Sequence, residues 1–168
     1  NPNQPVNQVL NALRVSLPEF DITTTNRVAA FIGQIAHESG ELRYLTELAT
    51  GDAYEGRQDL GNNQPGDGRR YKGRGFIQLT GRANYQAYQD ERAGPRFNAN
   101  VVANPNLVAT PAMGMDVSAW YWDKRKLNRY ADEWDLETIT RRINGGLNGF
   151  DRRVQYCTIA RDFLTRSS

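Results

Sequence analysis

Apolar residues recur at helical spacing in residues 5–48. A first helix is predicted between Pro5 and Pro18, with a buried face formed by Val6, Leu10, Leu13 and Leu17. A second is predicted from a cap at Thr24 or Thr25 to a stop at Ser39-Gly40, with a buried stripe of Val28, Phe31, Ile32 and Ile35. A shorter third helix is predicted from Leu42, Leu45 and Leu48.

The pattern changes in residues 50–75, where glycine and asparagine punctuate a polar stretch. So long an irregular segment inside a compact domain is usually functional. A short strand is predicted over residues 76–79 and a helix over residues 82–88. Three later helices are predicted: one beginning at Pro111, one capped by Asp135 and ending at Gly145-Gly146, and one beginning at Asp151, with Val154, Cys157, Ala160 and Leu164 facing inward.

These elements predict one domain over residues 1–168, mainly α, with a small short-stranded β element near residues 70–80. A chain of 168 residues suits a single core. Its hydrophobic fraction of 39% is slightly low for a globular protein but far above that of a disordered chain.

Charge and composition exclude several classes of protein. The net charge is only +2, with Lys and Arg scattered among acids, so no nucleic-acid partner is expected. One histidine and one cysteine are too few for a typical zinc site, and no metal or other cofactor is expected. One cysteine cannot form an internal disulfide, which favours a reducing compartment.

No signal peptide is predicted, and no apolar run is long enough to span a membrane, so no stable membrane insertion is expected. It begins at Asn1 without Met, which suggests that an upstream segment was removed.

Glu38 is the sharpest candidate for chemistry. It lies at the predicted C-terminal end of an otherwise apolar helix, where the helix dipole disfavours a carboxylate. Partial burial acts in the same direction, and a raised pKa is what a general acid needs. The alternative is an exposed glutamate at a helix end.

The polar segment supplies further candidates. Its acids are Asp52, Glu55, Asp59 and Asp67, and their spacing selects none of them. The turn at residues 73–75, GRG, permits close backbone approach to a ligand, although a tight turn explains it as well. The side chains that follow suit sugar hydroxyls and acetamido groups, or an ordinary polar surface: Gln78, Thr80, Asn84 and Tyr85.

Cys157 and His37 offer a different chemistry, a thiol nucleophile with a base. Cys157 lies on the apolar stripe of the last helix, which favours a buried thiol. Trp120, Trp122 and Trp134 suit stacking on sugar rings, but their helical spacing favours a place in the core.

Four segments, taken in order, resemble glycoside hydrolase family 19, the plant-type chitinases and their phage endolysin relatives. They are residues 31–40, FIGQIAHESG; 71–85, YKGRGFIQLTGRANY; 104–122, NPNLVATPAMGMDVSAWYW; and 143–147, INGGL. The first looks like the family's acid-bearing helix, and the second like its most diagnostic stretch. The similarity spans roughly residues 28–164 and implies a lysozyme-like α+β fold with a substrate cleft.

The resemblance also implies roles for individual residues. Glu38 matches the family's general acid, and Thr80 the Ser/Thr that helps hold the attacking water. Glu55, in the block AYEGR at 53–57, is chosen as general base because this block looks like that of endolysin members. Substrate contact is expected from Gln78, Asn84, Tyr85, Asn144 and Arg153, the last fitting the family's site arginine better than Arg152 does.

Differences from the family pattern suggest which type of family 19 protein this chain resembles. The chain is short and lacks the family's disulfides, and Ala83 replaces a sugar-contacting Tyr of plant chitinases. These traits resemble a phage lysin. The predicted function is therefore inverting hydrolysis of β-1,4 bonds in bacterial peptidoglycan by a monomer, which is held in the host cytoplasm until its release onto the cell wall.

Three alternatives stay open. A chitinase would use the same mechanism on N-acetylglucosamine polymers. A non-catalytic wall-binding module would keep the aromatic and Asn residues but would not need Glu38. An amidase built on Cys157 and His37 is the most distant alternative.

Overall fold

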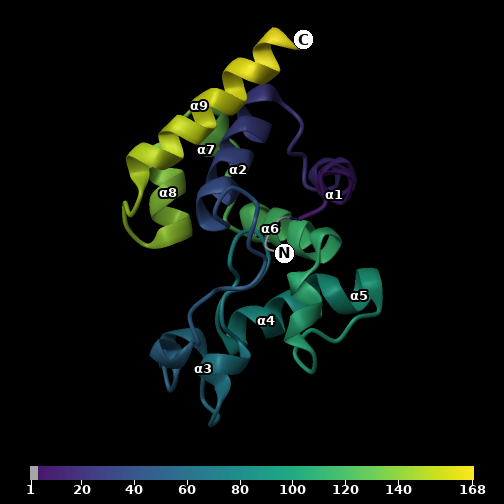
Figure 1. Cartoon of the computed structure of the whole chain (residues 1–168), viewed down its shortest axis with the longest axis vertical. Helices are drawn as coiled ribbons and strands as arrows, with labels where there is room; N and C mark the ends of the chain where they lie inside the picture. Colours follow the sequence, from purple (N-terminus) through teal and green to yellow (C-terminus); the bar gives the residue numbers. More distant parts are fainter. Residues whose placement is uncertain (1–3) are drawn as a thin grey trace.

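The computed structural model describes residues 4–168, which are mainly helical (Figure 1). In this part of the chain the α-helices are α1 (Val6–Glu19), α2 (Thr25–Glu38), α3 (Asp67–Arg70), α4 (Arg82–Tyr88), α5 (Gly94–Phe97), α6 (Pro111–Lys124), α7 (Asn128–Asp132), α8 (Leu136–Asn144) and α9 (Phe150–Arg166). Short 3-10 segments η1 (Asp52–Tyr54), η2 (Gln58–Leu60) and η4 (Pro105–Ala109), and a π-helical turn η3 (Gln89–Ala93), lie between them. The predicted mainly helical class is confirmed.

Helix α2 forms where the sequence predicts it. The Thr24 hydroxyl accepts a hydrogen bond from the backbone N–H of Arg27 at 3.3 Å, which caps the N-terminus. Gly40 then adopts a left-handed backbone, with φ of 58°, just beyond the helix end. Phe31 and Ile35 are fully buried, as the periodicity predicts.

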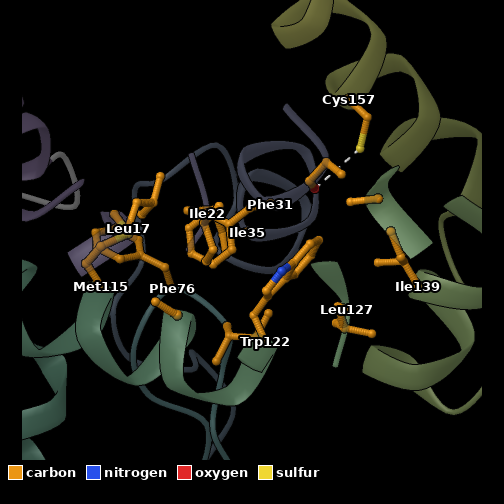
Figure 2. Close-up of a cluster of buried hydrophobic side chains, with 14 of the residues drawn as sticks. Leu17, Ile22, Phe31, Ile35, Phe76, Met115, Trp122, Leu127, Ile139 and Cys157 are labelled. Carbon is orange, nitrogen blue, oxygen red and sulfur yellow. Dashed lines mark hydrogen bonds between the residues drawn. The ribbon is translucent and has the colours of Figure 1, made fainter. Parts of the chain in front are cut away.

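Helices α2 and α9 cross at very close range. A Cβ atom on Gly33 would lie 2.2 Å from Sγ of Cys157 and 2.6 Å from its backbone nitrogen, so only glycine fits at this crossing. The Cys157 thiol is buried and contacts the carbonyl oxygen of Ala30 at 3.6 Å (Figure 2). The predicted inward position of Cys157 is confirmed.

Helix α6 joins the two halves of the molecule. Figure 1 shows it between an upper group, including α2, α8 and α9, and a lower group, including α3, α4 and α5. Trp122 enters the larger hydrophobic cluster and meets Phe31 edge to face, with ring centroids 5.5 Å apart (Figure 2). Trp120 enters the second cluster beside Tyr88, at 5.2 Å. Both tryptophans are therefore core residues, as their helical spacing favours.

The buried face of α1 differs in part from the predicted one: Leu17 is buried and Leu13 packs against the larger hydrophobic cluster, as predicted. Val6 and Leu10 are 70% and 43% exposed, and the residues that pack inward are Val9, Ala12, Ser16 and Leu17. Small side chains at 12 and 16 let α1 approach α6, a choice of face that apolar spacing alone does not reveal. Pro18 lies in the last turn, and the helix ends at Glu19, one residue beyond the predicted stop.

Two short predicted elements are absent. Residues 42–48 form no helix, because Glu41 and Leu42 both have positive φ, 63° and 65°, which breaks helical continuity after α2. Residues 76–79 form no strand. The β element consists of two isolated bridges, in which Arg74 pairs with Thr46 and with Leu79.

The remaining helices follow the prediction closely. Helix α4 covers residues 82–88 and α6 begins at Pro111. Asp135 caps α8 by accepting from the backbone N–H of Thr138 at 3.0 Å, and α9 begins one residue before Asp151. No helix among residues 4–168 has the length and apolar character needed to cross a membrane.

Candidate active site

An open cleft with a volume of about 710 Å³ runs between the two halves. The helical wall, from α2 and the region of α6 and α8, consists of Glu38, Tyr121, Arg125, Arg142, Ile143, Asn144 and Gly145. The loop wall consists of Glu47, Tyr54, Arg57, Asp59, Leu60, Ile77, Gln78, Leu79, Thr80 and Asn84. Figure 1 shows α2 and α8 in the upper half and the segment before α3 in the lower half.

Glu38 ends α2 on the helical wall, as predicted. Its Oε1 accepts a hydrogen bond from Nη2 of Arg153 at 2.7 Å, and its side chain is 19% exposed. Its Oε2 has no hydrogen-bond partner among residues 4–168. The carboxyl group is therefore oriented by one oxygen while the other remains available to a ligand.

Arg153 lies beneath Glu38 and does not line the cleft. It is 1% exposed, and it donates to Oε1 of Gln34 at 2.7 Å and to the carbonyl oxygen of Asn148 at 2.9 Å. Gln34 donates in turn to the Thr140 hydroxyl at 3.1 Å. This network joins α2, α8 and α9. The predicted substrate contact of Arg153 is replaced by a positioning contact with Glu38, because the side chain is enclosed by three helices.

Among the described acidic residues that line the cleft, Glu47 is the one that is not paired with an arginine. The Tyr54 hydroxyl donates to its Oε1 at 2.7 Å, and the backbone N–H of Gly73 donates to its Oε2 at 3.0 Å. A Cβ on Gly73 would lie 3.2 Å from that oxygen, so glycine permits the approach. Burial and the bond to Glu47 raise the pKa of Tyr54 to about 12, which keeps the phenol a donor at neutral pH.

Glu55, predicted as the general base, does not line the cleft. Its two carboxylate oxygens accept from the backbone N–H groups of Gly66, at 2.7 Å, and Gly68, at 2.8 Å. Both oxygens thus tie residue 55 to the segment around α3. This geometry contradicts a water-activating role, because the carboxylate bridges its own loop and does not face the cleft.

The other three loop acids are each paired with an arginine. The nitrogen–oxygen distances are 2.5 Å for Asp52 with Arg69, 2.6 Å for Asp59 with Arg57, and 2.7 Å for Asp67 with Arg82. In each pair the hydrogen bond from the guanidinium lowers the pKa of the carboxyl. Only Asp59 of the three lines the cleft.

A chain of hydrogen bonds shapes the loop wall. Gln78 has a left-handed backbone, with φ of 61°, and donates to the carbonyl oxygen of Gly75 at 2.9 Å. The Thr80 hydroxyl donates to the carbonyl oxygen of Gln78 at 3.0 Å, and Asn84 donates to that of Thr80 at 2.7 Å. With Asn144 on the helical wall, these predicted residues share the cleft with Glu38.

Three residues considered in the sequence analysis, Tyr85, Cys157 and His37, do not line the cleft. Tyr85 is fully buried and donates to the carbonyl oxygen of Lys72 at 2.8 Å, so the prediction that it contacts sugar is wrong. Burial raises the pKa of the Cys157 thiol to about 12. Burial lowers the pKa of His37, whose ring lies against Gly149. Neither residue of the amidase alternative lines the cleft.

Sequence reasoning missed Glu47, Tyr54, Tyr121, Arg125 and Arg142. Glu47 lies between Leu45 and Leu48, in a segment that the sequence analysis wrongly predicted as a helix. It was therefore not considered as a cleft residue. Among residues 4–168, no group of three or more His, Cys, Asp or Glu is arranged to hold a metal ion.

A mainly helical domain with several carboxyl groups lining one open cleft is the arrangement expected of a lysozyme-like glycoside hydrolase. The sequence model of glycoside hydrolase family 19, described as chitinase class I, matches residues 15–133. The chain belongs to glycoside hydrolase family 19 and is a chitinase-type member.

Similar proteins agree with this assignment. A glycosyl hydrolase family 19 domain-containing protein of Haemophilus influenzae is 29% identical, covering 89% of this chain and 86% of its own length. An endochitinase of Arabidopsis thaliana is 35% identical over 83% of this chain, which spans 47% of that protein. The crystal structure of chitinase C from Streptomyces griseus has a TM-score of 0.74 at 26% identity, covering 98% of this chain and 72% of its own.

Proposed function

We propose that this chain hydrolyses β-1,4 bonds between N-acetylated hexosamines, with Glu38 as general acid and Glu47 as general base. The observation that carries the proposal is that these two carboxyl groups, one at the end of α2 and one in the segment before η1, line the same cleft. Glycosidases of this kind require a carboxyl group on each side of the scissile bond.

The proposed reaction is a single displacement. Glu38 donates its proton to the glycosidic oxygen as the bond from that oxygen to the anomeric carbon breaks. A water molecule attacks the same carbon from the opposite face and transfers a proton to Glu47, so the anomeric configuration is inverted. Thr80, on the loop wall, offers a hydroxyl to help orient that water.

Chitin-type chains are the first proposed substrate, since several similar proteins are named endochitinases or chitinases. Peptidoglycan is a second candidate, because its glycan strands have the same linkage and N-acetyl groups. Two arginines of the helical wall without carboxylate partners, Arg125 and Arg142, favour this second polymer, which carries carboxylates.

Product analysis tests the proposal. The purified chain is incubated with N-acetylglucosamine oligomers and, separately, with peptidoglycan, and new reducing ends are identified by mass spectrometry. Proton NMR during cleavage should show the α-anomer first, as inversion requires. A β-anomer, or release of peptides from intact glycan strands, would contradict the mechanism.

A further inference from the structure

The cleft lining holds three carboxyl groups, of Glu38, Glu47 and Asp59, and three arginines, Arg57, Arg125 and Arg142, so its formal charges balance, but they are not all paired with one another. Asp59 is paired with Arg57, and Glu38 is paired with Arg153 beneath it. Of the described lining residues, Glu47 then remains as an anion, and Arg125 and Arg142 remain as cations. Neither of these arginines forms an ion pair or a side-chain hydrogen bond with any residue from 4 to 168.

Arg125 is held in place although it has no acidic partner. It follows the last turn of α6, and its guanidinium carbon lies 3.4 Å from the centroid of the Tyr121 ring. The Tyr121 hydroxyl donates to the carbonyl oxygen of Ile143 at 3.4 Å, which fixes the ring against the end of α8. Burial lowers the pKa of the Arg125 guanidinium, as expected for a half-buried cation without a nearby anion.

Arg142 supplies a second cation on the same wall. It lies in α8, two residues before the cleft residue Asn144, and its guanidinium carbon is 4.8 Å from the centroid of the Tyr130 ring. Stacking leaves the edges of a guanidinium free to donate. Two arginines with unused donors on one cleft wall form a setting that suits an anion carried by the substrate.

We propose that Arg125, assisted by Arg142, forms a subsite that binds a carboxylate carried by the polysaccharide. A planar guanidinium matches a carboxylate by two parallel hydrogen bonds, whereas a neutral chitin chain has no group that uses its charge. The subsite rests on the proposed function and refines it. It selects glycan strands in which a carboxylate is attached to a sugar over chains of N-acetylglucosamine alone.

A matched pair of substrates tests this subsite. Hydrolysis of the amide bond that joins peptide to sugar in peptidoglycan leaves glycan strands with free sugar-borne carboxylates, and conversion of those groups to methyl amides removes their charge. We expect the parent chain to prefer the charged strands. R125Q should lower kcat/KM on charged strands on the order of tenfold and leave kcat/KM on amidated strands within about twofold, because a charge-assisted bond is lost only with the former.

R129Q is the matched control. Arg129 also lies against a tyrosine, 4.9 Å from the Tyr130 ring centroid, but it does not line the cleft. It should behave like the parent on both substrates. Equal cleavage of the two substrates by the parent, or an equal loss on both in R125Q, would overturn the subsite.

Two further arms separate the possible failures. Strands that retain their peptides show whether the bound carboxylate belongs to the sugar or to the peptide: a selective loss confined to these strands would overturn the sugar-borne assignment. E38Q should be inactive on every substrate. If E38Q is inactive while R125Q shows no selectivity, the subsite fails and the proposed function stands; if E38Q is active, the proposed function fails.

Discussion

The helical wall and the loop wall hold their carboxyl groups by different means. On the helical wall, Glu38 is oriented by Arg153, a buried residue brought from the last helix. On the loop wall, Glu47 is oriented by Tyr54 and by the backbone of Gly73, both from the same irregular segment. One wall therefore depends on the packing of distant helices, and the other on hydrogen bonds within a single polar region.

This contrast predicts that mutations in the two walls affect stability and activity differently. A defect in helix packing should disturb Glu38 and the stability of the whole domain together, since three helices meet at Arg153. A defect in the loop wall should disturb activity with a smaller effect on the core, because the loop acids lie outside the larger hydrophobic cluster.

Removal of the acid should have the largest effect. Glu38→Gln keeps the shape of the side chain and removes the transferable proton, so kcat should fall on the order of 10²–10⁴. The melting temperature should change little. Hydrolysis of N-acetylglucosamine oligomers or peptidoglycan measures the loss, and a rate within threefold of the parent would remove Glu38 from the acid role.

Two glutamates, Glu47 just before the polar segment and Glu55 within it, sharpen the comparison. Glu47→Gln should lower kcat on the order of 10², because the base in the cleft is lost. Glu55→Gln should act mainly on stability, since its oxygens accept from the N–H groups of Gly66 and Gly68. A folded but inactive Glu55→Gln beside an active Glu47→Gln would return the base role to Glu55.

The packing of the helical wall is tested through Arg153. Arg153→Met removes the charge that pairs with Glu38 and leaves Gln34 short of a partner, so the free energy of unfolding should fall by about 3–5 kcal/mol. Activity below the melting point should also fall. Arg153→Lys should restore part of both. Urea unfolding and kcat are the measurements, and parent-like stability of Arg153→Met would argue against a positioning network.

The stability of the segment around α3 should depend on pH through Asp67. Its side chain is 2% exposed, and hydrogen bonds from Arg82 lower its pKa in the folded state. The stabilisation is therefore complete above the unfolded pKa of about 4, and it is lost as pH falls through the folded pKa. Asp67→Asn should cost about 2–3 kcal/mol at pH 7 and flatten the acid side of a stability–pH curve. An unchanged curve would contradict this pairing.

Treatment with a thiol-alkylating reagent should have no effect on activity. The Cys157 thiol is buried, and its pKa is raised to about 12. Treatment of the folded enzyme with iodoacetamide at neutral pH should leave activity intact, because almost no thiolate is present. Rapid inactivation with modification of Cys157 would favour the amidase alternative. It would contradict the proposal that Glu38 and Glu47 carry out the reaction.

Parts of the helical wall were predictable from sequence because local rules suffice there. The apolar period and the Thr24 cap place Glu38 at the end of α2, and Asp135 marks the start of α8. The segment matches to family 19 also place Thr80, Asn84 and Asn144 in the cleft. Each of these positions depends on local sequence or on a motif whose geometry is fixed by its own glycines.

The face that α1 buries and the role of Glu47 were decided by the tertiary structure. Apolar spacing favours Val6 and Leu10, yet contact with α6 selects the side with Ala12 and Ser16. Leucine spacing favours a helix through Glu47, yet positive φ at Glu41 and Leu42 redirects the chain.

The sequence by itself determined the helical class and the position of Glu38 at the end of α2, because capping and periodicity act within a few residues. Only the tertiary structure decided which other carboxylate shares the cleft with Glu38 and which arginine orients Glu38. Glu47 and Glu55 are similar as loop glutamates in sequence, but Tyr54 and Gly73 direct one to the cleft, and Gly66 and Gly68 hold the other away. Such choices depend on hydrogen bonds between segments that only folding brings together.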